Sequence, residues 1–108
     1  MSEYKNAMIA HRGFFDNMSK APENSLAAFQ NAVDAGLGIE MDVQLSKDGI
    51  PVVFHDFSLE RVCGVKGKIW DYTYEELSGF RLFGSDQKIP TFKEVLELVD
   101  GKVPLIIE

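Results

Sequence analysis

The chain has 108 residues, 45% of them apolar and 26% charged, as in an ordinary single-domain globular protein and unlike a disordered or fibrous one. With 11 basic and 17 acidic side chains the net charge is -6, which argues against a broad nucleic-acid or anionic-membrane surface, because both need clustered lysine and arginine. No apolar run approaches the roughly 20 residues that span a bilayer. We therefore expect one unit over residues 1–108 without a transmembrane segment.

The amino terminus and the cysteine content indicate the compartment. The first residues lack the basic segment and the apolar core of a signal peptide. The single Cys63 cannot form an intramolecular disulfide, and we interpret it as a small thiol in or near the core. Both features predict a cytoplasmic protein.

The first predicted elements are a strand and a helix. An apolar run at residues 7–10 predicts a buried strand that leads into a polar loop at residues 11–13. Asn24 or Ser25 is available to cap the helix that follows, and Gly36 stands where a left-handed residue would end it. The apolar residues at helical spacing are Leu26, Phe29, Ala32 and Val33.

A second strand and a hairpin come next. Residues 38–45 alternate between apolar and polar side chains, as the period of two in a strand requires. An Asp-Gly pair at residues 48–49 predicts a tight turn into a second β-rich run at residues 51–54. A two-residue loop would place His55 opposite Asp42, whereas a loop with one more residue would shift that pairing.

Two helices and a last strand complete the chain. The segments 73–76 and 91–94 both fit the capping box, in which a threonine hydroxyl and a glutamate carboxylate satisfy free amides at a helix start. The second helix should end at Gly101, before an apolar strand at residues 103–107. Alternating strands and helices predict a mainly parallel sheet, in a barrel or a doubly wound fold. The expected buried face of the second helix is Phe92, Val95, Leu96 and Val99.

Polar side chains gather where the predicted strands end, which is the active-site face of an α/β barrel. Glu40 and Asp42, two apart on a strand, should point to one face, and a buried pair of like charges needs a cation or a shared proton. With Glu108 there are three carboxylates at this face, and they suit Mg²⁺ or Ca²⁺ better than Zn²⁺. The alternative is a half-exposed strand with both carboxylates solvated. The residues expected to converge are His11, Arg12, Glu40, Asp42 and Glu108.

The two histidines have similar settings. His11 and His55 each follow an apolar strand and precede a charged residue. Imidazoles on either side of a phosphodiester could take a proton from the nucleophile and return one to the leaving group. Each histidine alone is also compatible with a structural role.

The arginines and the tryptophan allow more than one interpretation. Arg12 could hold a phosphate oxygen, or it could pair with Asp16 or Glu23. We interpret Arg61 as an exposed cation and Trp70 as a core aromatic, and we assign neither a catalytic role.

Four motifs carry a family resemblance: HRG at residues 11–13, PENS at 22–25, IEMDV at 39–43 and DGIPVVFHD at 48–56. In this order and spacing they resemble the glycerophosphodiester phosphodiesterases. The resemblance implies the amino-terminal portion of a distorted (β/α)₈ TIM barrel. It also implies that the parent enzyme hydrolyses glycerophosphodiesters to an alcohol and glycerol 3-phosphate.

The resemblance also implies residue roles. His11 and His55 correspond to the acid/base pair and Arg12 to a phosphate ligand. A divalent cation, Mg²⁺ or Ca²⁺, would be held by Glu40, Asp42 and Glu108. The lysine that usually follows the last glutamate is absent, and a whole barrel needs about 250 residues. We therefore expect a partial domain, apparently truncated, and leave the activity of the isolated chain open.

Other functions stay open at this stage. A related barrel phospholipase would use the same two histidines and metal. A non-catalytic module that binds a metal ion or phosphate is a second alternative, and such a module could associate with another copy to complete a barrel. Self-association of this kind would depend on concentration.

Overall fold

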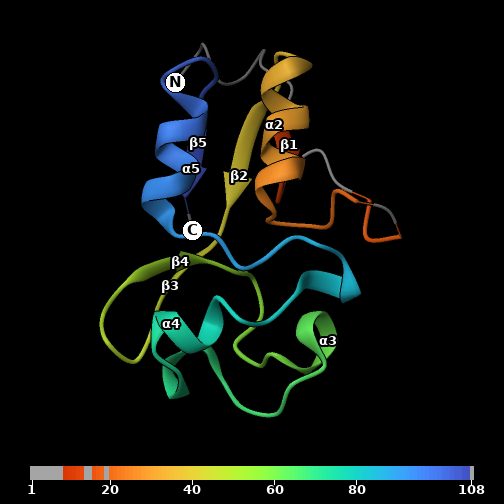
Figure 1. The fold of residues 1–108 in the computed structure, drawn as a ribbon. Helices are drawn as coiled ribbons and strands as arrows, with labels where there is room; N and C mark the ends of the chain where they lie inside the picture. Colours follow the sequence, from red (N-terminus) through yellow and green to blue (C-terminus); the bar gives the residue numbers. More distant parts are fainter. Residues whose placement is uncertain (1–8, 14–15, 19, 108) are drawn as a thin grey trace.

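The computed structural model describes residues 9–13, 16–18 and 20–107 (Figure 1). A parallel sheet with two long helices forms one part of the molecule, and a hairpin with short helices forms the other. The elements are β1 (Ile9–His11), α2 (Leu26–Asp34), β2 (Gly38–Met41), β3 (Val43–Leu45), β4 (Pro51–Val53), α3 (Glu60–Cys63), the 3₁₀ turn η1 (Ile69–Asp71), α4 (Tyr74–Leu77), the 3₁₀ turn η2 (Leu82–Gly84), α5 (Phe92–Val99) and β5 (Leu105–Ile107).

The three-stranded sheet has the order β1-β2-β5, and both of its pairings are parallel. All four residues of the central strand β2 are buried, as expected where a parallel strand is covered on both faces. Helices α2 and α5 pack against each other, and α2 also packs against β2. The core between them consists of Ala10, Phe29, Ala32, Ile39, Met41, Val53, Val95, Val99 and Val103.

Helix α2 begins and ends where its sequence predicts. Ser25 caps it, since the Ser25 hydroxyl accepts a hydrogen bond of 3.0 Å from the Ala28 amide. A serine cap of this kind is worth about 1 kcal/mol. The helix ends before Gly36, whose φ of +69° is in the left-handed region. The open choice between the two capping residues is thereby decided for Ser25.

The predicted strand over residues 38–45 is two strands with a break at Asp42. The first half, β2, lies in the parallel sheet, while the second half, β3, leaves it and pairs antiparallel with β4. The prediction of one strand was therefore wrong. Asp42 belongs to neither strand and lies between the two β-structures.

The hairpin has a three-residue loop instead of a two-residue one. The Ser46 amide donates to the Ile50 carbonyl at 3.0 Å, which leaves residues 47–49 as the loop. Gly49 has a φ of +80°, as the last residue of such a loop requires. The register therefore shifts by one residue, and the Phe54 amide, not His55, bonds to the Asp42 carbonyl at 3.0 Å.

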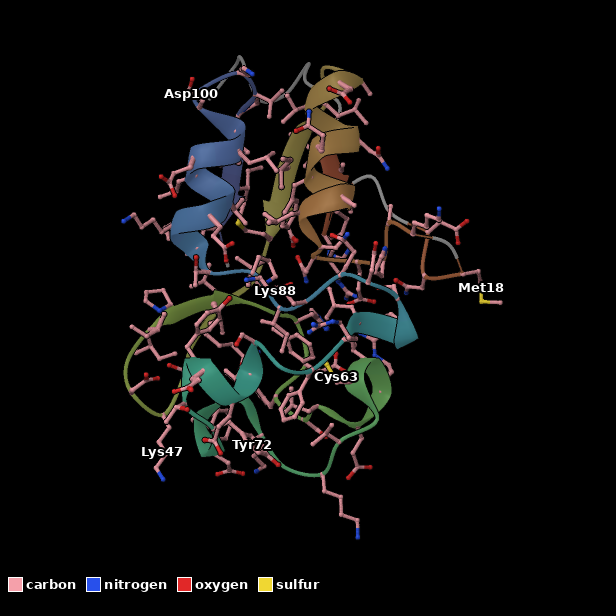
Figure 2. The ribbon with its side chains drawn as sticks, viewed as in Figure 1. Met18, Lys47, Cys63, Tyr72, Lys88 and Asp100 are labelled. Atoms are coloured by element: carbon pink, nitrogen blue, oxygen red, sulfur yellow. The ribbon has the colours of Figure 1, made fainter. Side chains whose placement is uncertain are left out.

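Both predicted capping boxes are present. The Thr73 and Thr91 hydroxyls accept from the Glu76 and Glu94 amides, and both glutamate side chains bond back to the threonine amides. Helix α5 ends at Val99, two residues before the predicted end at Gly101. Asp100 follows it in the left-handed conformation, with a φ of 47°. Figure 2 shows this end, marked by Asp100, and the hairpin loop, marked by Lys47, at opposite ends of the molecule.

Two predictions of burial were wrong. Leu96 is 43% exposed, because Val95 and Val99, four residues apart on α5, already occupy the buried face. Trp70 is 46% exposed and lies beside Phe57, with ring centroids 5.7 Å apart. The core near Trp70 is filled instead by its neighbour Ile69, which is fully buried.

A second apolar cluster supports the hairpin and the short helices. Cys63 lies at its edge, half-buried as predicted, and burial raises the pKa of its thiol to about 11. The cluster consists of Val52, Phe54, Leu59, Val62, Ile69, Leu77, Leu82 and Ile89.

Among the described residues no helix has the length and apolar character needed to cross a bilayer.

Candidate active site

The ends of β1 and β2 bring His11 and Glu40 together. The two residues are partners in the parallel register, so their side chains leave the sheet at the same edge. His11 Nε2 lies 3.2 Å from Glu40 Oε2. The imidazole is 61% exposed, whereas the carboxylate is 10% exposed. An accessible imidazole held by a buried carboxylate can exchange protons with a bound ligand.

The loop after β1 is strained, and the strain positions Arg12. Arg12 and Asn24 both have left-handed backbones, with φ of 58° and 56°, a conformation that costs a non-glycine residue roughly 1–2 kcal/mol. The Asn24 amide donates to the Arg12 carbonyl at 2.8 Å, and the Arg12 amide donates to the Glu40 carbonyl at 2.7 Å. These bonds hold the loop against both β2 and the start of α2.

The guanidinium of Arg12 contacts two other candidates. Its Nη1 donates to Glu23 Oε2 at 3.2 Å, and its Nη2 lies 3.0 Å from His55 Nε2. The pairing with Glu23, one of the two partners considered from sequence, is therefore present. The same guanidinium also contacts His55, so the candidate phosphate ligand Arg12 lies beside a candidate acid/base residue.

His55 follows β4 and is oriented from both sides. Gln44 of β3 donates to the carbonyls of Phe54 and Asp56 at 2.9 and 2.7 Å, which holds the backbone around His55. The imidazole Nδ1 lies 2.8 Å from Asp56 Oδ1. Arginine can only donate hydrogen bonds, so Nε2 of His55 must be the acceptor towards Arg12, and Nδ1 carries the proton.

Asp42 lies between β2 and β3, two residues after Glu40. Its Oδ2 atom is buried and accepts no hydrogen bond within the described part of the chain. A buried carboxylate oxygen without a donor is unfavourable unless a cation binds it. Carboxylate oxygens are the ligands that Mg²⁺ and Ca²⁺ prefer, so Asp42 fits such an ion.

The described residues do not contain three or more His, Cys, Asp or Glu side chains close enough to hold a metal ion. Glu40 and Asp42 are the two expected ligands within the described part, and Glu108 lies outside it. Its predicted role in metal binding stays a prediction.

Arg61 is a site residue that sequence reasoning missed. Its Nη1 and Nη2 donate to the two carboxylate oxygens of Glu23, each at 2.9 Å, and its Nε donates to Asp56 Oδ2 at 2.8 Å. Arg61 is exposed, as predicted, but its bonds to two carboxylates of the candidate site were not foreseen. Within the sequence, only the short spacing between Asp56 and Arg61 could have indicated this role, because Glu23 is 38 residues away from Arg61.

The network keeps both carboxylates ionised. Hydrogen bonds from Arg61 outweigh burial at Asp56 and lower its pKa to about 2. Burial on its own raises the pKa of Glu23, but hydrogen bonds from Arg61 and Asn17 and the charges of Arg61 and Arg12 bring it below the ordinary value. The same bonds raise the pKa of Arg61.

Known proteins match this chain over almost its whole length. The model of the glycerophosphoryl diester phosphodiesterase family matches residues 11–108, which include both histidines and all the expected metal ligands. The chain belongs to this family. The predicted family resemblance is therefore confirmed.

Three relatives of the family illustrate the similarity. A glycerophosphodiester phosphodiesterase of Bacillus altitudinis is 44% identical over 107 residues, which are 93% of this chain and 42% of that protein. A solved glycerophosphoryl diester phosphodiesterase of Parabacteroides distasonis has a TM-score of 0.83 at 39% identity, over 94% of this chain and 37% of that one. An Oleispira antarctica phosphodiesterase, solved in complex with the product sn-glycerol-3-phosphate, has a TM-score of 0.82 at 35% identity, over 96% of this chain and 45% of that one.

The structural neighbours decide between the two predicted α/β architectures. They are TIM barrels of the phosphodiesterase family, so the described residues adopt the fold of part of a (β/α)₈ barrel and not of a doubly wound sheet. The chain spans about two fifths of the length of the relatives that it matches.

Proposed function

We propose that this chain contributes the amino-terminal half of the active site of an enzyme that hydrolyses glycerophosphodiesters to an alcohol and glycerol 3-phosphate. The observation that supports this most is the contact between Arg12 and His55 beside the pair of His11 and Glu40. A phosphate ligand and two imidazoles at one end of a barrel are what phosphodiester hydrolysis requires. The product in the Oleispira antarctica structure supports the same substrate class.

In this proposal His55 and His11 move the protons. The attacking hydroxyl, of water or of the substrate's glycerol, forms the new P–O bond and gives its proton to Nε2 of His55, the nitrogen that carries a lone pair. His11 gives a proton to the oxygen of the alcohol as its bond to phosphorus breaks. Attack by the glycerol hydroxyl yields a cyclic phosphodiester, which a water molecule then opens to glycerol 3-phosphate, giving its proton to His11 while His55 returns a proton to the glycerol oxygen. When the phosphate binds, Arg12 leaves Nε2 and bonds a phosphate oxygen, so that the single lone pair of Nε2 is free to accept the proton.

Glu40, Asp42 and Glu108 would hold a divalent cation, Mg²⁺ or Ca²⁺. A bound cation of this kind polarises the phosphate and offsets the negative charge that develops during attack. The buried Oδ2 of Asp42 supports this assignment. The Glu40 carboxylate also contacts His11, while the backbone carbonyl of Asp42 accepts a hydrogen bond from the Phe54 amide.

The test is release of glycerol 3-phosphate from glycerophosphocholine by the full-length protein, with Mg²⁺, with Ca²⁺ and with EDTA. We expect activity that EDTA removes, and a loss of at least about 100-fold in His11→Ala and His55→Ala, which is the usual contribution of a general acid or base. Near-wild-type activity of either variant would remove that histidine from the mechanism. No release by the wild-type protein with either ion would overturn the proposed function.

Two further properties belong to this proposal. We propose that the isolated chain self-associates, because strand β5 carries exposed Ile106 and Ile107. A cytoplasmic location stays a prediction.

A further inference from the structure

Five side chains, including that of the candidate acid/base residue His55, form a closed ring of contacts. His55 contacts Asp56 through Nδ1 and Arg12 through Nε2. Arg12 and Asp56 are in turn connected through the pair of Glu23 and Arg61. With two cations, two anions and a neutral imidazole, the ring has no net charge. The members are Arg12, Glu23, His55, Asp56 and Arg61.

Arg61 is the member that joins the two carboxylates. It binds Glu23 through a pair of parallel bonds, each 2.9 Å long, and it binds Asp56 through Nε at 2.8 Å and Nη2 at 3.1 Å. A planar guanidinium with five donors can hold two carboxylates at fixed angles, which a lysine ammonium cannot do. The position of each carboxylate therefore depends on this one side chain.

Each carboxylate contacts one residue of the candidate active site. Asp56 Oδ1 lies 2.8 Å from His55 Nδ1, and Glu23 Oε2 accepts from Arg12 Nη1 at 3.2 Å. We propose that Arg61 is a positioning residue that keeps Asp56 on Nδ1 of His55 and Glu23 on Arg12, and thereby leaves Nε2 of His55 as the proton acceptor. The inference deepens the proposed function and rests on it for the role of Nε2.

The surroundings of the ring support a positioning role. Glu23 is 3% exposed, and an ionised carboxylate at that depth needs its partners. Asn17 Nδ2 donates to Glu23 Oε1 at 3.2 Å, while the Arg61 guanidinium lies over the Phe83 ring at 5.8 Å. Arg61 itself is 44% exposed, so solvent screens its ion pair with the partly exposed Asp56. The fixed geometry of the ring is therefore more consequential than its strength.

Loss of Arg61 should change the tautomer of His55. Without the guanidinium, Asp56 is held only by its contact with the imidazole, and Glu23 loses the two bonds that fix it against Arg12. Arg12 is then no longer held as the donor to Nε2. The neutral imidazole would then convert to the form with a proton on Nε2, which cannot accept a proton from a nucleophile. Arg12 would also lose its acceptor on His55.

The experiment reads the imidazole nitrogens directly. The ¹⁵N spectrum of the full-length protein, labelled in histidine, is recorded at about pH 8.5, where ordinary imidazoles are neutral. The His55 signals are identified by their loss in His55→Gln. We expect the proton on Nδ1 in the wild type, on Nε2 in Arg61→Gln, and a mixture in Arg61→Lys. The matched control is Arg81→Gln, because Arg81 bonds only to the carbonyls of Ser78 and Phe80 among the described residues.

The kinetic readout is kcat for glycerophosphocholine. A supporting residue of this kind is worth about 10- to 100-fold, so Arg61→Gln should lower kcat by that factor with a smaller change in KM, and Arg61→Lys should recover part of the loss. Should the Arg61→Gln protein fail to fold, Asp56→Ala makes the same test on the exposed side of the ring and should also move the proton to Nε2.

Each result has a definite meaning. An unchanged tautomer in Arg61→Gln, or in Asp56→Ala when Arg61→Gln does not fold, overturns the positioning role. A proton on Nε2 in the wild type overturns it as well. If the tautomer moves as expected while the wild type releases no glycerol 3-phosphate, the positioning role stands and the proposed function fails.

Discussion

Asp56 is ionised far into the acid range, because Arg61 donates two hydrogen bonds to it and His55 a third. The other carboxylate of the ring, Glu23, is nearly inaccessible to water and is stabilised by the same arginine. At the scale of single residues the site is therefore a set of mutually dependent charges. A change in one member should be felt by the others.

Asp56 makes the stability of the protein depend on pH. Its pKa is about 2 when folded, below the ordinary value of 3.8. A lowered pKa stabilises the folded state above the unfolded value, and this contribution is lost as pH falls from about 4 to 2. We expect urea denaturation to show a smaller loss of unfolding free energy in this window for Asp56→Asn than for the wild type. Between pH 6 and 7 the difference should be constant, and an equal slope at low pH would contradict the prediction.

Glu40 and Asp42 should control metal affinity. Calorimetry of the full-length protein with Mg²⁺ and Ca²⁺ should show affinity reduced by at least about tenfold in Glu40→Gln and in Asp42→Asn, because each removes a charged oxygen ligand. Glu97→Gln, on the exposed face of α5, is the matched control and should bind like the wild type. Unchanged binding in Asp42→Asn would remove that residue from the metal site.

At the scale of elements, the loop after β1 must approach α2 closely. Gly13 makes this approach, since a Cβ at this position would lie 3.0 Å from Ala28 Cβ and from Phe29 Cδ1. The backbone of Gly13 also has a φ of +85°. The same close packing brings Arg12 to the start of α2 and so to Glu23.

Gly13→Ala should destabilise the protein by more than the left-handed backbone alone explains. Gly49→Ala is the matched control, because Gly49 has a similar φ of +80° but nothing within 4 Å of a Cβ. The control should cost roughly 1–2 kcal/mol, and Gly13→Ala should exceed it by about 1–3 kcal/mol for overpacking. Urea denaturation measures both, and equal losses would show that the packing against α2 can relax.

At the scale of the whole molecule, β5 pairs with β2 on one side and presents an edge on the other within the described sheet. Ile106 and Ile107 on this strand are 36% and 49% exposed. The strand predicted from the apolar run at residues 103–107 is confirmed. In the structure its exposure follows from its place at the edge of a three-stranded sheet.

The exposed edge predicts association of the isolated chain. Sedimentation velocity should show a mass that rises with concentration, because an apolar strand edge can pair with another copy. Ile107→Lys should reduce this dependence, whereas Lys102→Arg, in the preceding exposed turn, should not. The same concentration dependence in Ile107→Lys and the wild type would contradict the involvement of β5.

The sequence alone determined the features that depend on near neighbours. Helix starts at Ser25, Thr73 and Thr91 follow from hydrogen bonds within four residues. The strand predicted at residues 7–10 is confirmed at residues 9–10, and residues 7–8 lie outside the described residues. The order of strands and helices predicted a mainly parallel sheet, in a barrel or a doubly wound fold, and four short motifs predicted the family with its barrel. These signals suffice because each one lies within a single element or its flanking loop.

Only the tertiary structure decided what depends on distant contacts. The predicted strand is interrupted at Asp42 because β2 and β3 pair with different strands. Arg61 is part of the site because folding brings it to Glu23, 38 residues away, and Trp70 is exposed because Ile69 fills the core. Pairing across the chain is set by the combined free energy of packing and hydrogen bonding of the whole fold, and local sequence patterns do not contain that information.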